Sequence, residues 1–158
     1  MVVFKLPKMT KQEMWKLIRR QRLCRIAFKG NTYPYMAPFQ YVVIDDSLYF
    51  HFTDYGKKMK LIENDKHVCV EIEEYREDLS EYSFVVFHGN LEAVTDQTER
   101  TNAINQLRKE GEQKLSPNFL PAHGFTKQDG WASLTPENKT LVVIKLENVT
   151  QEIGLKSP

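Results

Sequence analysis

Residues 49–58 have the sequence Tyr-Phe-His-Phe-Thr-Asp-Tyr-Gly-Lys-Lys, and this stretch is the strongest indication of both fold and function. Its aromatic first half is typical of a β-strand, while Asp54 and Gly56 indicate a turn. Apolar residues at helical spacing follow between positions 59 and 62. They predict a short helix that begins near Lys57, with Asp54 as its cap.

The start of this predicted helix is suited to bind a phosphate group. A helix N-terminus presents unpaired backbone N–H groups and the positive end of the helix dipole. Lys57 and Lys58 would add positive charge there, and the Thr53 hydroxyl would add a hydrogen-bonding group. The alternative is that the two lysines are ordinary solvated surface residues.

Length and charge narrow the class of protein. The 158 residues fit one domain that spans positions 1–158, and 22 Lys and Arg are nearly balanced by 21 Asp and Glu. We therefore expect no nucleic-acid partner, because no global excess of positive charge is available to neutralise phosphates. We also expect no membrane association, since the N-terminus lacks a signal-peptide pattern and no apolar run reaches membrane-spanning length.

The cysteines and histidines show no pattern of a metal site or a disulfide framework. Cys24 and Cys69 lie singly within apolar segments, so we expect buried free thiols in a cytoplasmic protein. No metal site is expected, because no ligand spacing relates the four histidines, His51, His67, His88 and His123.

Local patterns predict mostly strands, with a few helices. Capping-box patterns at 10–13 and 96–99 each precede a helix, the first of which ends near residue 21. Residues 74–81 are expected to be a solvent loop, and the polar segment 110–139 a lid, a partner contact or a disordered insert. The predicted strands are 23–28, 33–44, 47–53, 66–73, 82–94 with a bulge at Gly89, and 141–146. Six strands joined mostly by short turns predict a mainly β fold, an antiparallel barrel with peripheral helices.

Two of these strands carry further information. Pro38, within the second strand, indicates a sheet edge, a bulge or a position that faces a ligand. Alternation along 82–94 puts Phe84 and Val86 on one face and Val85 and Phe87 on the other, so both faces are apolar. We expect one face to pack on the barrel core and the other on a second copy in a two-fold homodimer. The alternative is that a peripheral helix of the same chain covers the second face.

The order of these motifs resembles that of the pyridoxamine 5′-phosphate oxidase-like family, which has an FMN-binding split barrel. The likeness is strongest to its nitroimidazole-reductase-type branch. It covers about residues 10–108, and the closing strand at 141–149 fits more loosely. The matching motifs are Arg25-Ile26-Ala27, Tyr33–Tyr41, Leu48–His51, Gly56–Lys58 with Asn64, Val68–Glu71 and Val85–Glu92.

The resemblance implies a homodimer with two FMN molecules held in clefts between the subunits. The implied cofactor-binding residues are Met36, Ala37, Pro38, Phe39, Gln40 and Tyr41 along the isoalloxazine and ribityl chain, His51, Phe52 and Thr53 at ribityl and phosphate oxygens, Lys57 and Lys58 at the phosphate, and Phe84 from across the dimer interface.

The implied function is that of an FMN-dependent oxidoreductase, which passes electrons from a nicotinamide or other donor to a small-molecule acceptor. Pyridoxamine phosphate oxidation itself is not expected, because residues 152–158 lack the Arg and His with which true oxidases of this name bind the substrate phosphate. Two alternatives stay open. One is a flavin-binding or electron-carrier module without its own substrate, and the other is a haem- or deazaflavin-binding relative on the same barrel.

The sequence identifies no catalytic residue. His51 is the candidate for proton transfer, and the alternative is a half-buried strand histidine that bonds to the backbone. Trp131 would either stack on the flavin as part of a lid or pin the segment 110–139 to the barrel.

Overall fold

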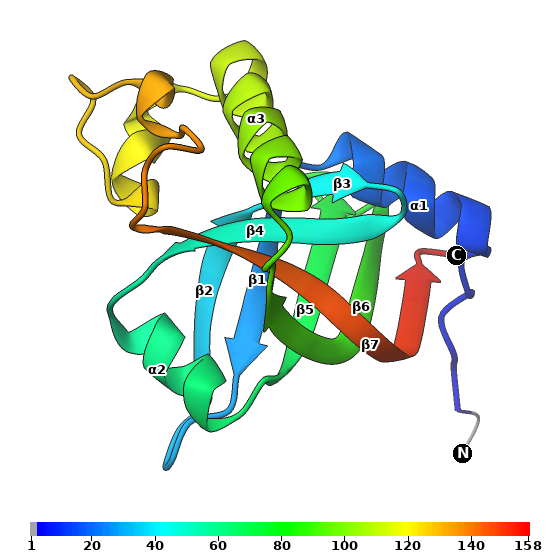
Figure 1. The fold of residues 1–158 in the computed structure, drawn as a ribbon. Helices are drawn as coiled ribbons and strands as arrows, with labels where there is room; N and C mark the ends of the chain where they lie inside the picture. The colour runs from blue at the N-terminus through cyan, green and yellow to red at the C-terminus, as the bar shows by residue number, and fades with distance from the viewer. Residues whose placement is uncertain (1–2) are drawn as a thin grey trace.

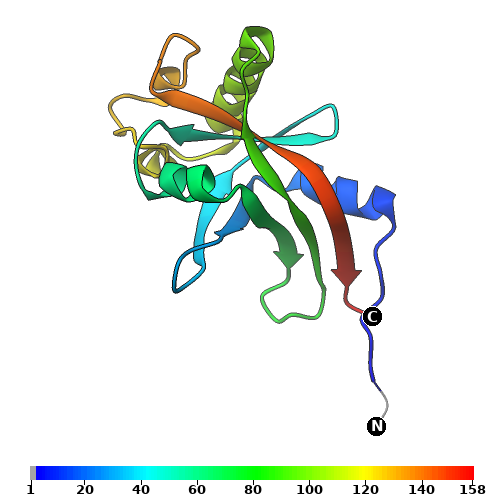
Figure 2. The ribbon, with the colours of Figure 1, turned by 60° about the horizontal axis from the view of Figure 1, so that its bottom comes forward.

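In the computed structural model, which describes residues 3–158, seven strands form one antiparallel sheet in the order β2-β1-β5-β6-β7-β4-β3. The sheet curls on itself into a half-open barrel, and the helices lie around its outside (Figures 1 and 2). The strands are β1 (Leu23–Phe28), β2 (Tyr35–Gln40), β3 (Val42–Ile44), β4 (Ser47–Thr53), β5 (His67–Tyr75), β6 (Tyr82–Ala93) and β7 (Leu141–Lys156). The helices are α1 (Lys11–Arg20), α2 (Lys57–Asn64) and α3 (Gln97–Lys114), with two 3₁₀ helices, η1 (Pro117–His123) and η2 (Trp131–Ser133).

The predicted mainly β fold with peripheral helices is confirmed, with seven strands in place of six. The difference lies in residues 33–44, which form two strands, β2 and β3, at opposite edges of the sheet. Tyr41 separates them, because its backbone N–H donates to Arg22 O and its buried hydroxyl donates to Ile18 O. Pro38 lies on the edge strand β2, which is one of the three positions that its missing N–H indicated.

Helix starts follow the local sequence at α1 and α3 but not at α2. Thr10 and Glu13 form the complete predicted capping box of α1, and the Asp96 side chain accepts from the Glu99 N–H at α3. The predicted Asp54 cap is wrong: the N-cap of α2 is Gly56, at φ 99°, without a side-chain hydrogen bond. Among the helices of residues 3–158, none is long and apolar enough to cross a membrane.

The main core fills the inside of the curled sheet. Along β6, Val85 and Phe87 point into this core and are buried, whereas Phe84 and Val86 lie half-buried on the outer face. The same alternation governs the cysteines. Cys24 is buried as predicted, but the prediction is wrong for Cys69, which is exposed on the outer face of β5 because its neighbours take the inward positions.

The last strand, β7, is longer than the predicted 141–146. Its first part pairs with β4, and it also pairs with β6 along most of its length. The register between β6 and β7 shifts between His88 and Asn90, which confirms the predicted bulge at Gly89. A side chain at Gly89 would not fit, because a Cβ there would lie 2.9 Å from Glu147 O.

The segment 110–139 is ordered and packs beside α3 at the end of β4 and β7 (Figure 1). Its first residues complete α3, and η1 and η2 follow. It has a small apolar cluster of its own, built from Leu120, Trp131 and Leu134 together with Leu141 of β7.

Candidate functional site

The two predicted phosphate-binding lysines lie on aromatic rings at the start of α2. The ammonium nitrogen of Lys57 is 4.7 Å from the centroid of the Tyr35 ring. That of Lys58 is 4.9 Å from the centroid of Phe39 and 5.8 Å from that of Phe52. The rings come from β2 and β4, so the barrel wall itself holds both ammonium groups near the beginning of the helix through cation–π attraction.

Within residues 3–158, no carboxylate forms an ion pair with either of these two ammonium groups. Burial against the aromatic rings lowers the pKa of Lys58, because the charged form loses solvation. An anion bound at this position would offset that cost, so the start of α2 is electrostatically suited to one.

The backbone at this position adds to the positive potential. The first turn of α2 contains no acidic residue. Its N-cap, Gly56, has no side chain that could accept hydrogen bonds from the free N–H groups of this turn. The Thr53 hydroxyl donates to Tyr55 O in the preceding turn, at 3.0 Å, so its proton is already engaged. We call Gly56, Lys57 and Lys58, at the start of α2, the lysine cradle.

The predicted residues of β2 divide into two groups by alternation. Met36 and Pro38 are exposed on the outer surface of the strand, on the face opposite to Tyr35 and Phe39. Ala37 and Phe39 face the core, and Phe39 is the ring below Lys58. At the far end of the strand, the buried Gln40 Nε2 donates to Leu107 O at 3.1 Å, which leaves its Oε1 without a partner in the described chain.

Tyr41 and Phe52 face the protein interior. The Tyr41 hydroxyl is engaged by Ile18 O, and its pKa is raised because it is buried. Phe52 is a core residue that also lies below Lys58. Their roles at a cofactor stay predictions, and their side chains have little surface left for a ligand in this chain.

His51 lies against a residue that the sequence did not connect with it. Its Nε2 contacts Nδ1 of His123, which is the last residue of η1, and both imidazoles are buried. Burial lowers the pKa of His51 well below its ordinary value, with smaller contributions from His123 and Lys58. Burial, together with Lys58, lowers the pKa of His123 to about 4. Both rings are therefore neutral near neutral pH, and His51 does not face an open groove.

Phe84 does not join the lysine cradle within one chain. It lies half-buried on the outer face of β6, opposite Glu73 of β5 and Leu155 of β7. Its face of the strand continues through Val86 to His88 and Asn90.

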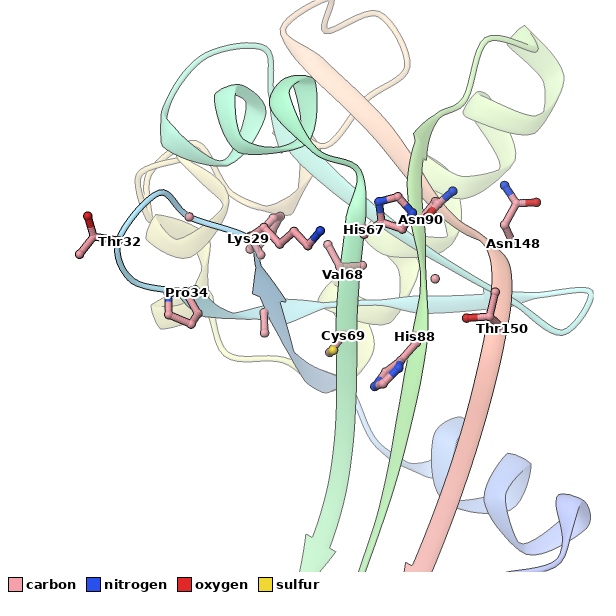
Figure 3. Close-up of a pocket in the computed structure, with 14 residues that line it drawn as sticks. Lys29, Thr32, Pro34, His67, Val68, Cys69, His88, Asn90, Asn148 and Thr150 are labelled. Carbon is pink, nitrogen blue, oxygen red and sulfur yellow. The ribbon is translucent and has the colours of Figure 1, made fainter.

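A cavity of about 720 Å³ lies on this outer face, with walls from the end of β1, the β1–β2 turn, β5, β6 and β7 (Figure 3). None of the predicted cofactor-binding residues lines it. Its polar groups include Lys29, His67, His88, Asn90 and Thr150, set among apolar side chains. Cys69 and His88 are direct cross-strand neighbours in its wall. The size suits a flat ring system, since ligand pockets commonly measure about 300–1,000 Å³.

Solved structures with the same fold come from several bacteria. An FAD-binding protein from Mesorhizobium loti has a TM-score of 0.69 at 19% identity, over 98% of this chain and 100% of its own. A candidate 5-nitroimidazole antibiotic resistance protein from Bacteroides thetaiotaomicron has a TM-score of 0.67 at 19% identity, and the match covers 96% of this chain and 87% of that protein. The FAD-binding protein from Mycobacterium smegmatis has a TM-score of 0.64 at 15% identity, and the match covers 96% of this chain and 100% of that protein. At these identities the likeness shows a common fold.

Sequence comparison identifies the family. No curated protein matches the chain significantly. The sequence model described as pyridoxamine 5′-phosphate oxidase matches residues 10–141, which is most of the chain. The match includes the lysine cradle, β2 and the His51–His123 contact, and it agrees with the order of motifs found in the sequence. The chain therefore belongs to the pyridoxamine 5′-phosphate oxidase family.

Proposed function

We propose that this protein binds FMN and works as an oxidoreductase that passes electrons from a nicotinamide or other donor to a small acceptor. The observation that carries the proposal is the uncompensated positive charge of the lysine cradle. Two ammonium groups, one of them half-buried, stand at a helix N-terminus without a carboxylate partner in the described chain. A terminal phosphate, with a charge of about −1.5 to −2, matches this arrangement.

Family membership and the fold support a flavin as the molecule that carries this phosphate. Two of the solved structures with the same fold are FAD-binding proteins. We favour FMN for this chain because a phosphate at the end of the ligand suits two adjacent lysines at one helix start. When bound, the flavin supplies the electron-transfer chemistry, while the protein holds and orients it and limits its contact with water.

The flavin ring would lie between two subunits. The lysine cradle and the 720 Å³ cavity share no residue, and the cavity lies on the face that carries Phe84 and Val86. A two-fold dimer can set this face of one subunit against the cradle and β2 of the other. The exposed Met36 and Pro38 would then line one side of the ring, and Phe84 of the second copy would approach the other.

The test is a comparison of two ligands that differ in the phosphate. Replacing Lys57→Ala together with Lys58→Ala should weaken FMN binding by about 2–4 kcal/mol, roughly 30- to 1,000-fold, since two charge-assisted contacts are lost. Riboflavin lacks the phosphate and should lose little affinity on the same change. Titration of flavin fluorescence measures both affinities.

The matched control is Lys60→Ala, an exposed lysine on the same helix that lies outside the cradle. It should leave FMN affinity unchanged. Equal FMN affinity of the double variant and the unchanged protein would show that the cradle is misplaced. A titration with FAD beside FMN decides which flavin fits better.

A carrier without its own substrate is the second candidate, and one observation favours it. His51, the residue that the sequence proposed for proton transfer, is buried against His123 and is not accessible to a bound ligand. Bleaching of the bound flavin by NADH or NADPH would support the oxidoreductase. A flavin that binds tightly and is reduced by neither donor would support the carrier. A Soret band in the purified protein would point to haem instead.

A further inference from the structure

The His51–His123 pair joins two parts of the chain that are far apart in sequence. The ring centroids are 4.4 Å apart and the planes are inclined by only 16°. With Nε2 of His51 in contact with Nδ1 of His123, the rings lie nearly coplanar and face each other edge to edge. Of the hydrogen bonds in residues 3–158, this is the one that joins η1 to β4.

The pair has a fixed number of protons when it is neutral. Each neutral imidazole carries one N–H, so one proton lies in the bond and the other on an outer nitrogen. The outer nitrogens are Nδ1 of His51 and Nε2 of His123, which are buried and have no hydrogen-bond partner in the described chain. An added proton would therefore lie in apolar surroundings without an acceptor.

The groups around the pair cannot compensate an added positive charge. From α2 the Lys58 ammonium acts on both rings, and it is itself positive. From β7 the residue opposite His51 is Val143, while Phe119 of η1 and Trp131 of η2 meet His123 edge-on at 5.2 and 5.5 Å. No carboxylate of residues 3–158 makes a hydrogen bond or an ion pair with either imidazole.

The contact also borders the lysine cradle. Gly124 follows His123 at a φ of 83°, and a Cβ built on it would lie 3.5 Å from the Thr53 methyl group. Thr53 in turn donates its hydroxyl proton to Tyr55, just before the start of α2. The end of η1 therefore lies against the turn that leads into the cradle.

We propose that the His51–His123 pair is a pH-sensitive clasp, which holds the segment 115–139 on β4 and releases it when the two imidazoles take up protons. Release uncovers Thr53 and the turn before the lysine cradle. This device depends on residues of the described chain alone and does not require that a flavin binds.

The sign of the pH effect follows from the two states. In the released state both imidazoles are solvated and have the ordinary pKa of about 6.5, whereas burial and Lys58 lower their pKa values in the closed state. Release is thus accompanied by proton uptake, and it becomes easier as pH falls below about 6.5. Each proton taken up raises the release equilibrium by about tenfold per pH unit, so two protons give up to about a hundredfold.

Hydrogen exchange on the full chain without ligand tests the clasp. Exchange rates of peptides that cover 117–134 are measured from about pH 7.5 to about pH 5 and corrected for the intrinsic dependence of exchange on pH. Corrected rates should rise by about ten- to a hundredfold per pH unit below about pH 6.5. Peptides of β5 and β6 should stay protected, which separates local release from unfolding.

Two variants and one further measurement complete the test. His123→Gln removes one of the two titrating groups and should weaken the pH dependence of the 117–134 peptides, because His51 alone can then take up a proton, while His88→Gln, on the outer sheet face, should leave it as in the wild type. Unchanged pH dependence in His123→Gln, or corrected wild-type rates that do not vary with pH, would overturn the clasp. If His123→Gln does not fold, the wild type decides. Imidazole NMR signals of His51 and His123 that titrate over the same pH range in which the corrected exchange of 117–134 rises support the clasp, and titration of the two without such a rise overturns it.

Discussion

At the scale of single residues, Gly111 of α3 forms the contact on which the side chain of Trp131 packs. The indole is buried, and a Cβ at position 111 would lie 2.3 Å from its Cε3 atom and 2.5 Å from Cζ3. Only a residue without a side chain lets the ring lie directly on the helix backbone. The attachment of η2, and with it the segment 115–139, to α3 therefore depends on this glycine.

Gly111→Ala should destabilise the protein. Overpacking against the indole costs about 1–3 kcal/mol, which exceeds the gain of about 1 kcal/mol that alanine brings within a helix. Urea unfolding followed by Trp fluorescence measures the difference. Asn105→Ala, at an exposed position of the same helix, is the control and should be neutral or slightly stabilising. Equal or greater stability of Gly111→Ala would mean that the indole has room to move.

The residues at the candidate site were predictable from the sequence to different degrees. Lys57 and Lys58 could be found because a helix start, a turn and two lysines are neighbours in sequence. His123 could not be connected with His51, because 72 positions separate them and nothing local records the contact. The exposure of Cys69 could not be predicted because its neighbours in sequence are apolar and made the whole segment look buried. In the strand, residues alternate between the two faces, and Cys69 takes an outward position.

At the scale of elements, the first turn of α3 links the helix to the sheet. The Asp96 side chain caps it by accepting from the Glu99 N–H at 2.7 Å. The Glu99 carboxylate accepts from the Tyr49 hydroxyl and from Lys145, at 2.6 and 3.1 Å, instead of completing a capping box. These bonds lower the pKa of Glu99 and raise that of Lys145. The cap therefore positions a residue that joins α3 to β4 and β7.

Asp96→Ala should lower the free energy of unfolding by about 1 kcal/mol, because one N–H of the first turn loses its acceptor. Thermal unfolding followed by circular dichroism would show the loss. Gln97→Ala, the exposed neighbour within the helix, is the control and should change stability little. A capping role is rejected if both variants melt at the temperature of the unchanged protein.

Element boundaries were predictable wherever a local signal sets them. The starts of α1 and α3 follow from capping residues, and the bulge at Gly89 from a glycine within a strand. The division of 33–44 into β2 and β3 has a different cause. It depends on the hydrogen bonds of Tyr41 to Arg22 and Ile18. These residues are distant from Tyr41 in sequence, so secondary-structure propensities around residues 33–44 do not reveal the contact.

At the scale of the whole molecule, the curled sheet has one filled side and one side that is only partly covered. Apolar alternation predicted both faces of β6 correctly as apolar, and the barrel core buries Val85 and Phe87. Phe84 and Val86 remain half-buried on the same strand face as His88 and Asn90, which line the 720 Å³ cavity. The cavity itself could not be predicted, because its walls come from the end of β1, the β1–β2 turn, β5, β6 and β7, which meet only in the fold.

The remaining apolar face leads to a prediction about assembly. We expect a two-fold homodimer that buries Phe84 and Val86, with the flavin clefts at the interface. Phe84→Asp would place a charge in this interface and should shift sedimentation from dimer to monomer. Leu79→Asn, which changes an exposed apolar residue in the β5–β6 turn, should leave the dimer intact.

Because the proposed clefts need both subunits, FMN binding and dimerisation should stabilise each other. FMN at about 100 times its Kd should stabilise the folded dimer by about 2.7 kcal/mol, and it should lower the concentration at which dimers dissociate. Phe84→Asp should lose FMN affinity although its lysine cradle is unchanged. Sedimentation at micromolar concentration with and without FMN measures the coupling. A monomer that still holds FMN would show that one chain contains the whole site, and that Phe84 and Val86 serve another purpose.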